Sequence, residues 1–449
     1  MNKLIPSTIK MDNPNEAILI YEGLVDVIYN DHVENVEISI IQSWLPTPQV
    51  KFNFEIATPP LSFLNSDGKT IEIKSDGLFR WKAIVLEIIE NEKVCFSGIL
   101  EKSVFTGDIN KKIKQLDFSL FNFRSYFGYN FEVTEKSKRT GEISFKTNDH
   151  SILIHSVNSI NDQNKAERQV GGYIYTNACR IKFKEPASYE KVEYLRIRLS
   201  LFLSFINGRK SYPRFIKAYS ASGDLLWEDH SSYHVDIYKS VVSWMPFKID
   251  KTFTDLWANF LSITENEDDF EKISLIIHWY LEALNNSGHS IGSIFMLQTA
   301  FEILYNWHVN EEKKINPYTK KNQRWASNKI RTILAHYNIG LELPCFYSEP
   351  FKGIYLKEKD PPYDFCFWFT QIRNMFVHFS KDDSDNLKKL PKHYDWYLIN
   401  TAIFNLEVIM LKMLDYEDLI TSRLLVDERN DLNQIHINSP YEPVSFYRN

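Results

Sequence analysis

The first half of the chain alternates between apolar and polar positions over many short segments. Residues 50–56 read VKFNFEI and residues 70–74 read TIEIK, and such alternation is typical of a β-strand with one buried face. Turn signals such as Ser66-Asp67-Gly68 separate these segments. The pattern therefore predicts a sandwich or barrel-like β domain over residues 1–245, with one helix at 190–206. Further strands are expected at 18–21, 24–28, 36–41, 94–100, 114–121, 141–146 and 151–157.

From about residue 250 the apolar residues recur every three or four positions, which is the period of a helix. Residues 250–425 are therefore expected to form an all-helical bundle of five or six helices. Residues 426–449 have no clear period and are expected to form a C-terminal tail. The predicted fold class is multidomain α+β, with a β-rich N-terminal domain followed by an all-α bundle. Its helices are predicted at 252–263, 265–285, 290–308, a segment ending near 337, 361–380 with Asp360 as its cap, and 393–414, with a polar loop at 381–391.

Composition supports a folded protein of the cytoplasm. Hydrophobic residues make up 44% of the 449 residues, which is enough for real cores. The net charge of −6 argues against a strongly basic coat for nucleic acid, although it leaves room for a local basic cleft. No signal peptide or membrane span is expected, because no apolar run is long enough. The four cysteines lack metal-ligand or redox spacing and are expected to be free thiols of a reducing compartment: Cys95, Cys179, Cys345 and Cys366.

The most informative segment is 365–380, FCFWFTQIRNMFVHFS, in which an apolar helical stripe is combined with polar residues. Arg373 lies about 100° from the centre of the stripe, and Asn374 and His378 share the far side because they are four residues apart. Such a helix can bury one face while it presents three polar groups outward. The stripe consists of Phe365, Trp368, Phe369, Ile372, Met375, Phe376 and Phe379.

This segment resembles the HEPN nucleases, helical bundles that carry Arg, four to six intervening residues and His, often with Asn after the Arg. The matching residues are Arg373, Asn374 and His378. LQTAFEILY at 297–305 and IRNMFVHF at 372–379, followed by a closing helix, resemble the ApeA branch of that family, whose members also have a β-rich N-terminal domain. The resemblance implies a metal-independent endoribonuclease without a cofactor, acting as a homodimer in anti-phage defence by abortive infection. It also implies that the N-terminal domain senses a phage-derived trigger or restrains the nuclease.

The Arg–His spacing occurs three times, so spacing alone does not select the site. Arg331 precedes His336 but is followed by Thr332, and Arg429 precedes His436 in the aperiodic tail. Only Arg373 combines the following Asn with a long apolar helix and a further helix beyond it. Arg373 and His378 are therefore the expected catalytic residues, with Asn374 positioning the substrate.

The residue types suit RNA cleavage without a metal ion. That reaction needs a base for the 2′-hydroxyl, an acid for the leaving oxygen and positive charge on the phosphorane-like transition state. Histidine titrates near neutral pH, and arginine grips phosphate oxygens in bidentate fashion. One histidine does not easily perform both proton transfers. The resemblance to HEPN nucleases, which pair two subunits so that two Arg–His sets share a cleft, therefore implies a homodimer with a composite site.

Supporting candidates and rival interpretations stay open at the sequence level. Glu302 borders the core face of its helix and is a candidate to orient Arg373, the alternative being an ordinary surface glutamate. His230 and His234 in WEDHSSYH are expected to be ordinary polar residues of the surface and not ligands of a metal ion. The rival function is a non-catalytic scaffold or RNA-binding module, and a weaker third makes the β domain a ligand-binding module. A basic stretch could contact RNA or simply face solvent: Lys313, Lys314, Lys320, Lys321, Arg324, Lys329 and Arg331.

Overall fold

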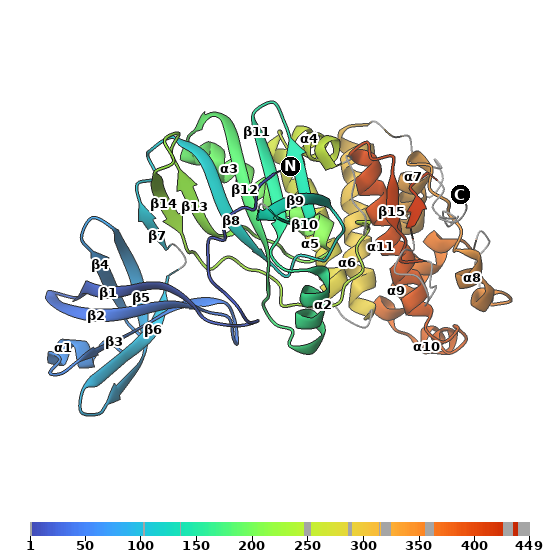
Figure 1. Ribbon diagram of the computed structural model, residues 1–449. Coiled ribbons are helices and arrows are strands. Elements are labelled where there is room, and N and C mark those ends of the chain that lie inside the picture. Colours follow the sequence, from blue (N-terminus) through green and yellow to red (C-terminus); the bar gives the residue numbers. More distant parts are fainter. Residues whose placement is uncertain are drawn as a thin grey trace. The chain divides into compact units, whose positions relative to one another are not determined.

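In the computed structural model the chain forms two compact units. Figure 1 shows its helices and strands, coloured along the sequence. The first unit comprises Met1–Leu203, Lys210–Ser240 and Lys248–Thr254, and the second comprises Ser204–Arg209, Val241–Phe247 and Asp255–Asn449. Leu203 and Ser204 belong to different units although they are neighbours in one helix, so part of the boundary between the units lies within that helix. The structure describes residues 2–101, 104–134, 136–246, 253–285, 290–313, 315, 325–354, 363–424 and 434–438.

The first unit begins with a closed barrel of six strands in the order β1-β2-β3-β6-β5-β4. Alternate residues fill its interior, as in β3, where Val50, Phe52 and Phe54 are buried between exposed or half-buried neighbours. Gly98 of β6 faces the ring of Phe52, where there is no room for a side chain. The bounds are β1 Ile18–Tyr29, β2 His32–Ser43, β3 Gln49–Ile56, β4 Thr70–Ser75, β5 Phe79–Glu90 and β6 Val94–Leu100, with the one-turn helix α1 Leu61–Leu64.

The same unit continues into an eight-stranded antiparallel sheet in the order β7-β14-β13-β8-β12-β11-β10-β9. One face is apolar and is covered by α3, on which Phe202 packs edge-to-face against Phe145 of β10 at 5.8 Å between ring centroids. The bounds are β7 Phe105–Gly107, β8 Ile113–Phe121, β9 Tyr129–Thr134, β10 Ser137–Lys146, β11 His150–Ser156, α2 Ile160–Gln169, β12 Tyr175–Ala187, α3 Tyr189–Asn207, β13 Arg214–Tyr219 and β14 Leu225–Asp229.

The opposite face of this sheet is polar, and the N-terminal segment crosses it. The hydroxyls of Thr8 and Ser119 lie 2.7 Å apart, and Tyr175 donates a hydrogen bond to Ser7 at 2.9 Å. At the other end of the segment, the amide of Asn2 donates to Glu142, whose carboxylate also binds a buried histidine. The first residues of the chain are thus part of the folded sheet.

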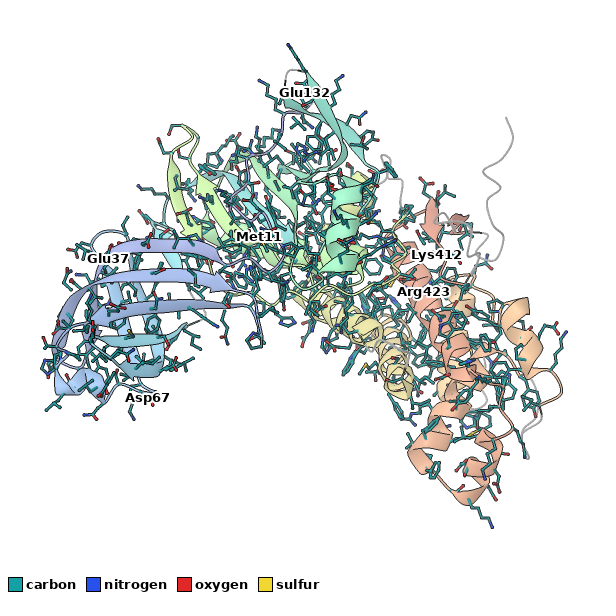
Figure 2. The ribbon with its side chains drawn as sticks, turned by 60° about the horizontal axis from the view of Figure 1, so that its bottom comes forward. Met11, Glu37, Asp67, Glu132, Lys412 and Arg423 are labelled. Carbon is teal, nitrogen blue, oxygen red and sulfur yellow. The ribbon has the colours of Figure 1, made fainter. Side chains whose placement is uncertain are left out.

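The second unit is built around α11, which is buried on all sides from Leu398 to Leu411. Glu407 in this helix is fully buried and forms an ion pair with Arg423 at 2.6 Å, and Tyr280 donates a hydrogen bond to the same carboxylate at 2.7 Å. Arg423, labelled in Figure 2, thereby ties the segment after α11 to the centre of the bundle. A buried charge is tolerated here because it is paired and hydrogen-bonded.

Helices provide most of the second unit, and a short two-stranded sheet completes it. In the bounds that follow, η1 is a π-helical turn and η2 a 3₁₀ turn. The elements are α4 Phe253–Ile263, α5 Glu267–Asn285, α6 Ile291–Tyr305, η1 Asn306–Glu311, α7 Ala326–His336, α8 Cys345–Ser348, η2 Glu349–Phe351, α9 Phe365–His378, α10 Lys381–Leu387, α11 Tyr394–Met413, β15 Leu419–Thr421 and β16 Gln434–His436.

The structure confirms a multidomain α+β protein with a β-rich N-terminal half and a helical C-terminal region. The expectation of an all-helical second half is wrong, because β15 pairs with β16. The expected polar loop at 381–391 contains α10, which starts with a reciprocal cap between Ser380 and Asp383. Phe379 does not belong to the apolar stripe, since α9 ends before it and 62% of its surface is exposed. The expected cap Asp360 lies outside the described residues, and Asp364 caps α9 instead.

Candidate functional site

The start of α9 is fixed by a buried carboxylate. Asp364 accepts a hydrogen bond from the backbone N–H of Phe367 at 2.8 Å, which satisfies one of the free donors at the helix start. The next six residues are all buried, so the first half of the helix lies inside the bundle. Phe369 packs edge-to-face against Phe301 of α6, with 6.3 Å between ring centroids. The polar end of α9 is therefore held on a rigid support.

Arg331, one of the alternative arginines, is a structural residue. Its guanidinium binds both oxygens of Asp364, at 2.6 and 2.8 Å, and a third nitrogen donates to Asn328 at 2.7 Å. Both side chains of the ion pair are buried, with 7% and 1% of their surfaces exposed. Arg331 is consequently unable to face a substrate, and the second alternative, Arg429, lies outside the described residues.

Arg373, Asn374 and His378 lie on the outer half of α9. Arg373 is half-buried; it donates to the amide oxygen of Asn374 at 3.2 Å, and its guanidinium lies 5.7 Å from the ring centroid of Phe295. His378 is the last residue of the helix and is exposed, and no hydrogen bond joins it to Arg373 or Asn374. Among the described side chains, no carboxylate lies within ion-pair distance of Arg373. The cation is held in place but not neutralised.

Glu302 does not orient Arg373. It forms an ion pair with Lys329 of α7, whose ammonium also lies 5.6 Å from the ring centroid of Tyr305. In the predicted basic stretch, Lys329 thus forms an ion pair with Glu302, and Arg331 is buried. Lys314, Lys320, Lys321 and Arg324 lie outside the described residues.

A second polar constellation surrounds a cavity of about 670 Å³ in the helical unit. The Nδ1 atom of His308 lies 2.8 Å from a carboxylate oxygen of Glu312, and its Nε2 lies 3.3 Å from the hydroxyl of Tyr337. His308 belongs to the π-helical turn η1, a type of turn that is frequent at functional sites. Burial lowers the pKa of His336, which also lines the cavity, and burial raises the pKa of Tyr337 above its usual range.

The sequence does not predict this cavity. The four-residue spacing of His308 and Glu312 is the one local pattern that indicates a contact between two of its side chains. Glu312, His308 and Tyr337 form a row of a carboxylate, an imidazole and a phenol, along which a proton can be transferred. Glu265 and Asp269 also line the cavity, however, so three carboxylates face it. Their charge repels phosphate, so this cavity is an unfavourable place for a phosphate group.

No metal centre emerges from these residues. In the cluster that contains His230 and His234, each histidine has one nearby carboxylate, Glu228 at 3.9 Å and Asp236 at 3.3 Å. Across the described parts of the chain, no group of three His, Cys, Asp or Glu side chains could hold a metal ion. The described helices likewise include none that is long and apolar enough to cross a membrane.

Two family models match the chain, one over most of the eight-stranded sheet and one over most of the helical unit. Residues 108–241 match the YopA central domain, and residues 266–431 match the YopA C-terminal domain. The chain is similar to YopA over these two domains. The YopA central-domain match contains the strands β8 to β14, and the YopA C-terminal match contains Arg373, Asn374 and His378. No match was found among curated proteins or among solved structures.

The expected membership of the HEPN family and its ApeA branch is therefore wrong. The family models that match are YopA domains, and no HEPN or ApeA domain is found. The resemblance rested on a short Arg–Asn–His pattern, two apolar segments and a β-rich N-terminal domain. The anti-phage role and the phage-derived trigger rested on that resemblance alone and lose their support with it.

Proposed function

We propose that the helical unit cleaves RNA without a metal ion, at the end of α9. The observation that carries this proposal is the state of Arg373: its guanidinium is held by Asn374 and Phe295 but has no carboxylate partner among the described residues. A guanidinium that is fixed in place and not neutralised by a carboxylate suits a phosphate group. The guanidinium needs little rearrangement when negative charge develops on the phosphate during the reaction. His378, exposed five residues further along α9, supplies an imidazole that can accept or donate a proton.

The chemistry follows from these residue types. The 2′-hydroxyl oxygen attacks the adjacent phosphorus, the bond from phosphorus to the 5′-oxygen breaks, and a 2′,3′-cyclic phosphate forms. A base removes the proton of the 2′-hydroxyl while an acid protonates the leaving oxygen. Arg373 holds the non-bridging oxygens, and Asn374 keeps the guanidinium in place. His378 performs one of the two proton transfers.

A second copy of the chain would supply the other proton transfer. His378 lies between two exposed apolar side chains, Val377 with 44% and Phe379 with 62% of the surface exposed. Apolar residues at these exposures suit a surface that another molecule covers. A homodimer that joins two α9 ends would bring two histidines and two arginines to one substrate.

One observation favours a non-catalytic RNA-binding module as the second candidate. No described side chain is hydrogen-bonded to His378, whereas catalytic histidines are commonly held by a second group. In that case Arg373 would bind phosphate, and His378 would add only contact area.

The test uses a 5′-labelled single-stranded RNA with the full chain, and EDTA is present throughout. Wild type is compared with His378→Ala, Arg373→Ala and His278→Ala, the last an exposed helical histidine of the same unit. We expect cleavage by wild type and His278→Ala, and at least a hundredfold loss in the other two. Cleavage that persists in His378→Ala would overturn the proposal. Binding without cleavage in wild type, weakened only by Arg373→Ala, would establish the RNA-binding module instead.

A further inference from the structure

The polar face of the eight-stranded sheet contains a cleft of about 640 Å³, which lies entirely within the first unit. Strands β8, β12 and β13 form its floor, and they are neighbours in the sheet. The crossing N-terminal segment and the hairpin between β13 and β14 border it. Its lining includes the carboxylate of Asp117 and the cationic side chains of Lys114, Arg180, Lys182 and Lys217.

The cleft is positively charged although the chain carries a net charge of −6. Four cationic side chains line it, whereas Asp117 is the single acidic residue in the lining. Pairing of the strands places Arg180 on one side of Asp117 and Lys217 on the other, and it places Lys182 opposite Gln115. Because antiparallel neighbours point to the same face, these side chains converge on one region.

The cations differ in how far they are already neutralised. Arg180 binds Asp117 through Nε and Nη2, at 2.7 and 2.6 Å, and its Nη1 has no bonded partner in the described structure. Lys217 pairs with Glu228 at 2.8 Å, and Lys114 donates to the backbone oxygen of Lys184.

Lys182 is exposed and bonds to no described residue. The cleft thus combines an arginine that a buried carboxylate holds in a fixed orientation with at least one uncommitted ammonium. This combination is suited to an anion, which can accept bidentate bonds from a planar guanidinium and a point-charge contact from lysine.

We propose that this cleft binds a small ligand that carries a phosphate or polyphosphate group, of about the size of a nucleotide. Its volume lies within the range of about 300–1,000 Å³ that is usual for small-molecule sites. The cationic side chains are gathered over three neighbouring strands, so they match one compact anion better than an extended strand of RNA. Ser220 and Ser222 add hydroxyls at the rim, where they also contact Asp224. This site is independent of the proposed RNA cleavage at α9.

Titration calorimetry on the full chain tests the proposal with three probes: ATP, inorganic pyrophosphate and a 20-nucleotide RNA. Variants are Lys182→Gln and Lys217→Gln, and the matched control is Lys138→Gln, an exposed lysine of β10 outside the cleft. We expect ATP and pyrophosphate to bind to wild type and to Lys138→Gln with equal Kd. In Lys182→Gln, whose side chain has no structural role to lose, Kd should rise at least fivefold with unchanged thermal stability.

Three results would overturn the inference. The first is the absence of binding by both ATP and pyrophosphate at millimolar concentration. The second is binding that Lys182→Gln and Lys217→Gln leave unchanged. The third is RNA that binds more tightly than ATP and weakens equally in the same variants, which would make the cleft a nucleic-acid surface. Each result is distinct from loss of RNA cleavage, because that activity is measured with His378 variants.

Discussion

Replacement of Asp364 by alanine tests how the candidate site is held in place. Asp364 has two roles, since it caps the start of α9 and neutralises the buried guanidinium of Arg331. The alanine variant removes both contacts and leaves a buried, charged guanidinium that has lost its carboxylate, although it still donates a hydrogen bond to Asn328. We therefore expect α9 to lose its fixed start, although residues 373–378 themselves are unchanged.

The size of the effect follows from burial. The side chains of Arg331 and Asp364 are 7% and 1% exposed, so solvent screens their interaction very little. Removal of one partner of such a pair costs about 3–5 kcal/mol, and loss of a helix cap costs about 1 kcal/mol. Because the same carboxylate serves both roles, the two losses overlap, and we expect the free energy of unfolding to fall by about 4–5 kcal/mol.

Urea unfolding followed by circular dichroism at 222 nm provides the measurement. Asp364→Asn keeps a side-chain oxygen for the cap but loses the charge, so it separates the two roles. The double variant Arg331→Met with Asp364→Asn removes the stranded charge and should recover most of the loss. Asp385→Ala, which breaks an exposed ion pair with Lys388, is the control and should leave stability unchanged. A loss below about 1 kcal/mol in Asp364→Ala, or no recovery in the double variant, would refute this reasoning.

Two further predictions concern the first unit. Burial lowers the pKa of His150 from 6.5 to about 4, so the folded protein disfavours protonation of this side chain. The contribution of the neutral imidazole to stability is therefore complete above pH 6.5 and is lost as the pH falls toward 4. We expect wild type to lose up to about 3 kcal/mol more than His150→Gln over that interval in pH-dependent urea titrations, and equal losses would contradict this. In Gly98→Ala the added carbon would lie 2.0 Å from the backbone oxygen of Ile84 and 2.8 Å from the ring of Phe52. We therefore expect the free energy of unfolding, measured by thermal denaturation, to fall by at least about 2 kcal/mol. The neighbouring substitution Ser97→Ala is the control and should leave it almost unchanged.

Periodicity in the sequence predicted the elements with one buried face and missed those with mixed patterns. Every expected strand of the barrel exists, but β5 was not predicted, because its alternation breaks at the irregularity between Val85 and Glu87. β12 was also missed, although Cys179, Ile181 and Phe183 alternate there with charged residues. A helix as short as α10 has no stripe to reveal it, and only its cap is readable.

The candidate site was only partly predictable, because its decisive contacts join residues that are distant in sequence. Arg331 and Arg373 have similar local patterns, and only the position of Asp364, 33 residues after Arg331, shows that the first is structural. The partner of Glu302 is likewise Lys329 and not the expected Arg373. The cationic cleft depends on the pairing of β12 and β13 with β8, which no local pattern reveals.

The first residues of the chain also protect the sheet from other chains. β9 is its last strand, and its outer edge would present unpaired backbone groups to solvent. Instead, the N–H of Leu4 donates to the backbone oxygen of Glu132, and the N–H of Glu132 donates to Asn2, both at 2.8 Å (Glu132 is labelled in Figure 2). Removal of residues 1–8 would therefore expose an edge that favours aggregation. It would also remove Ser7 and Thr8 from the cationic cleft.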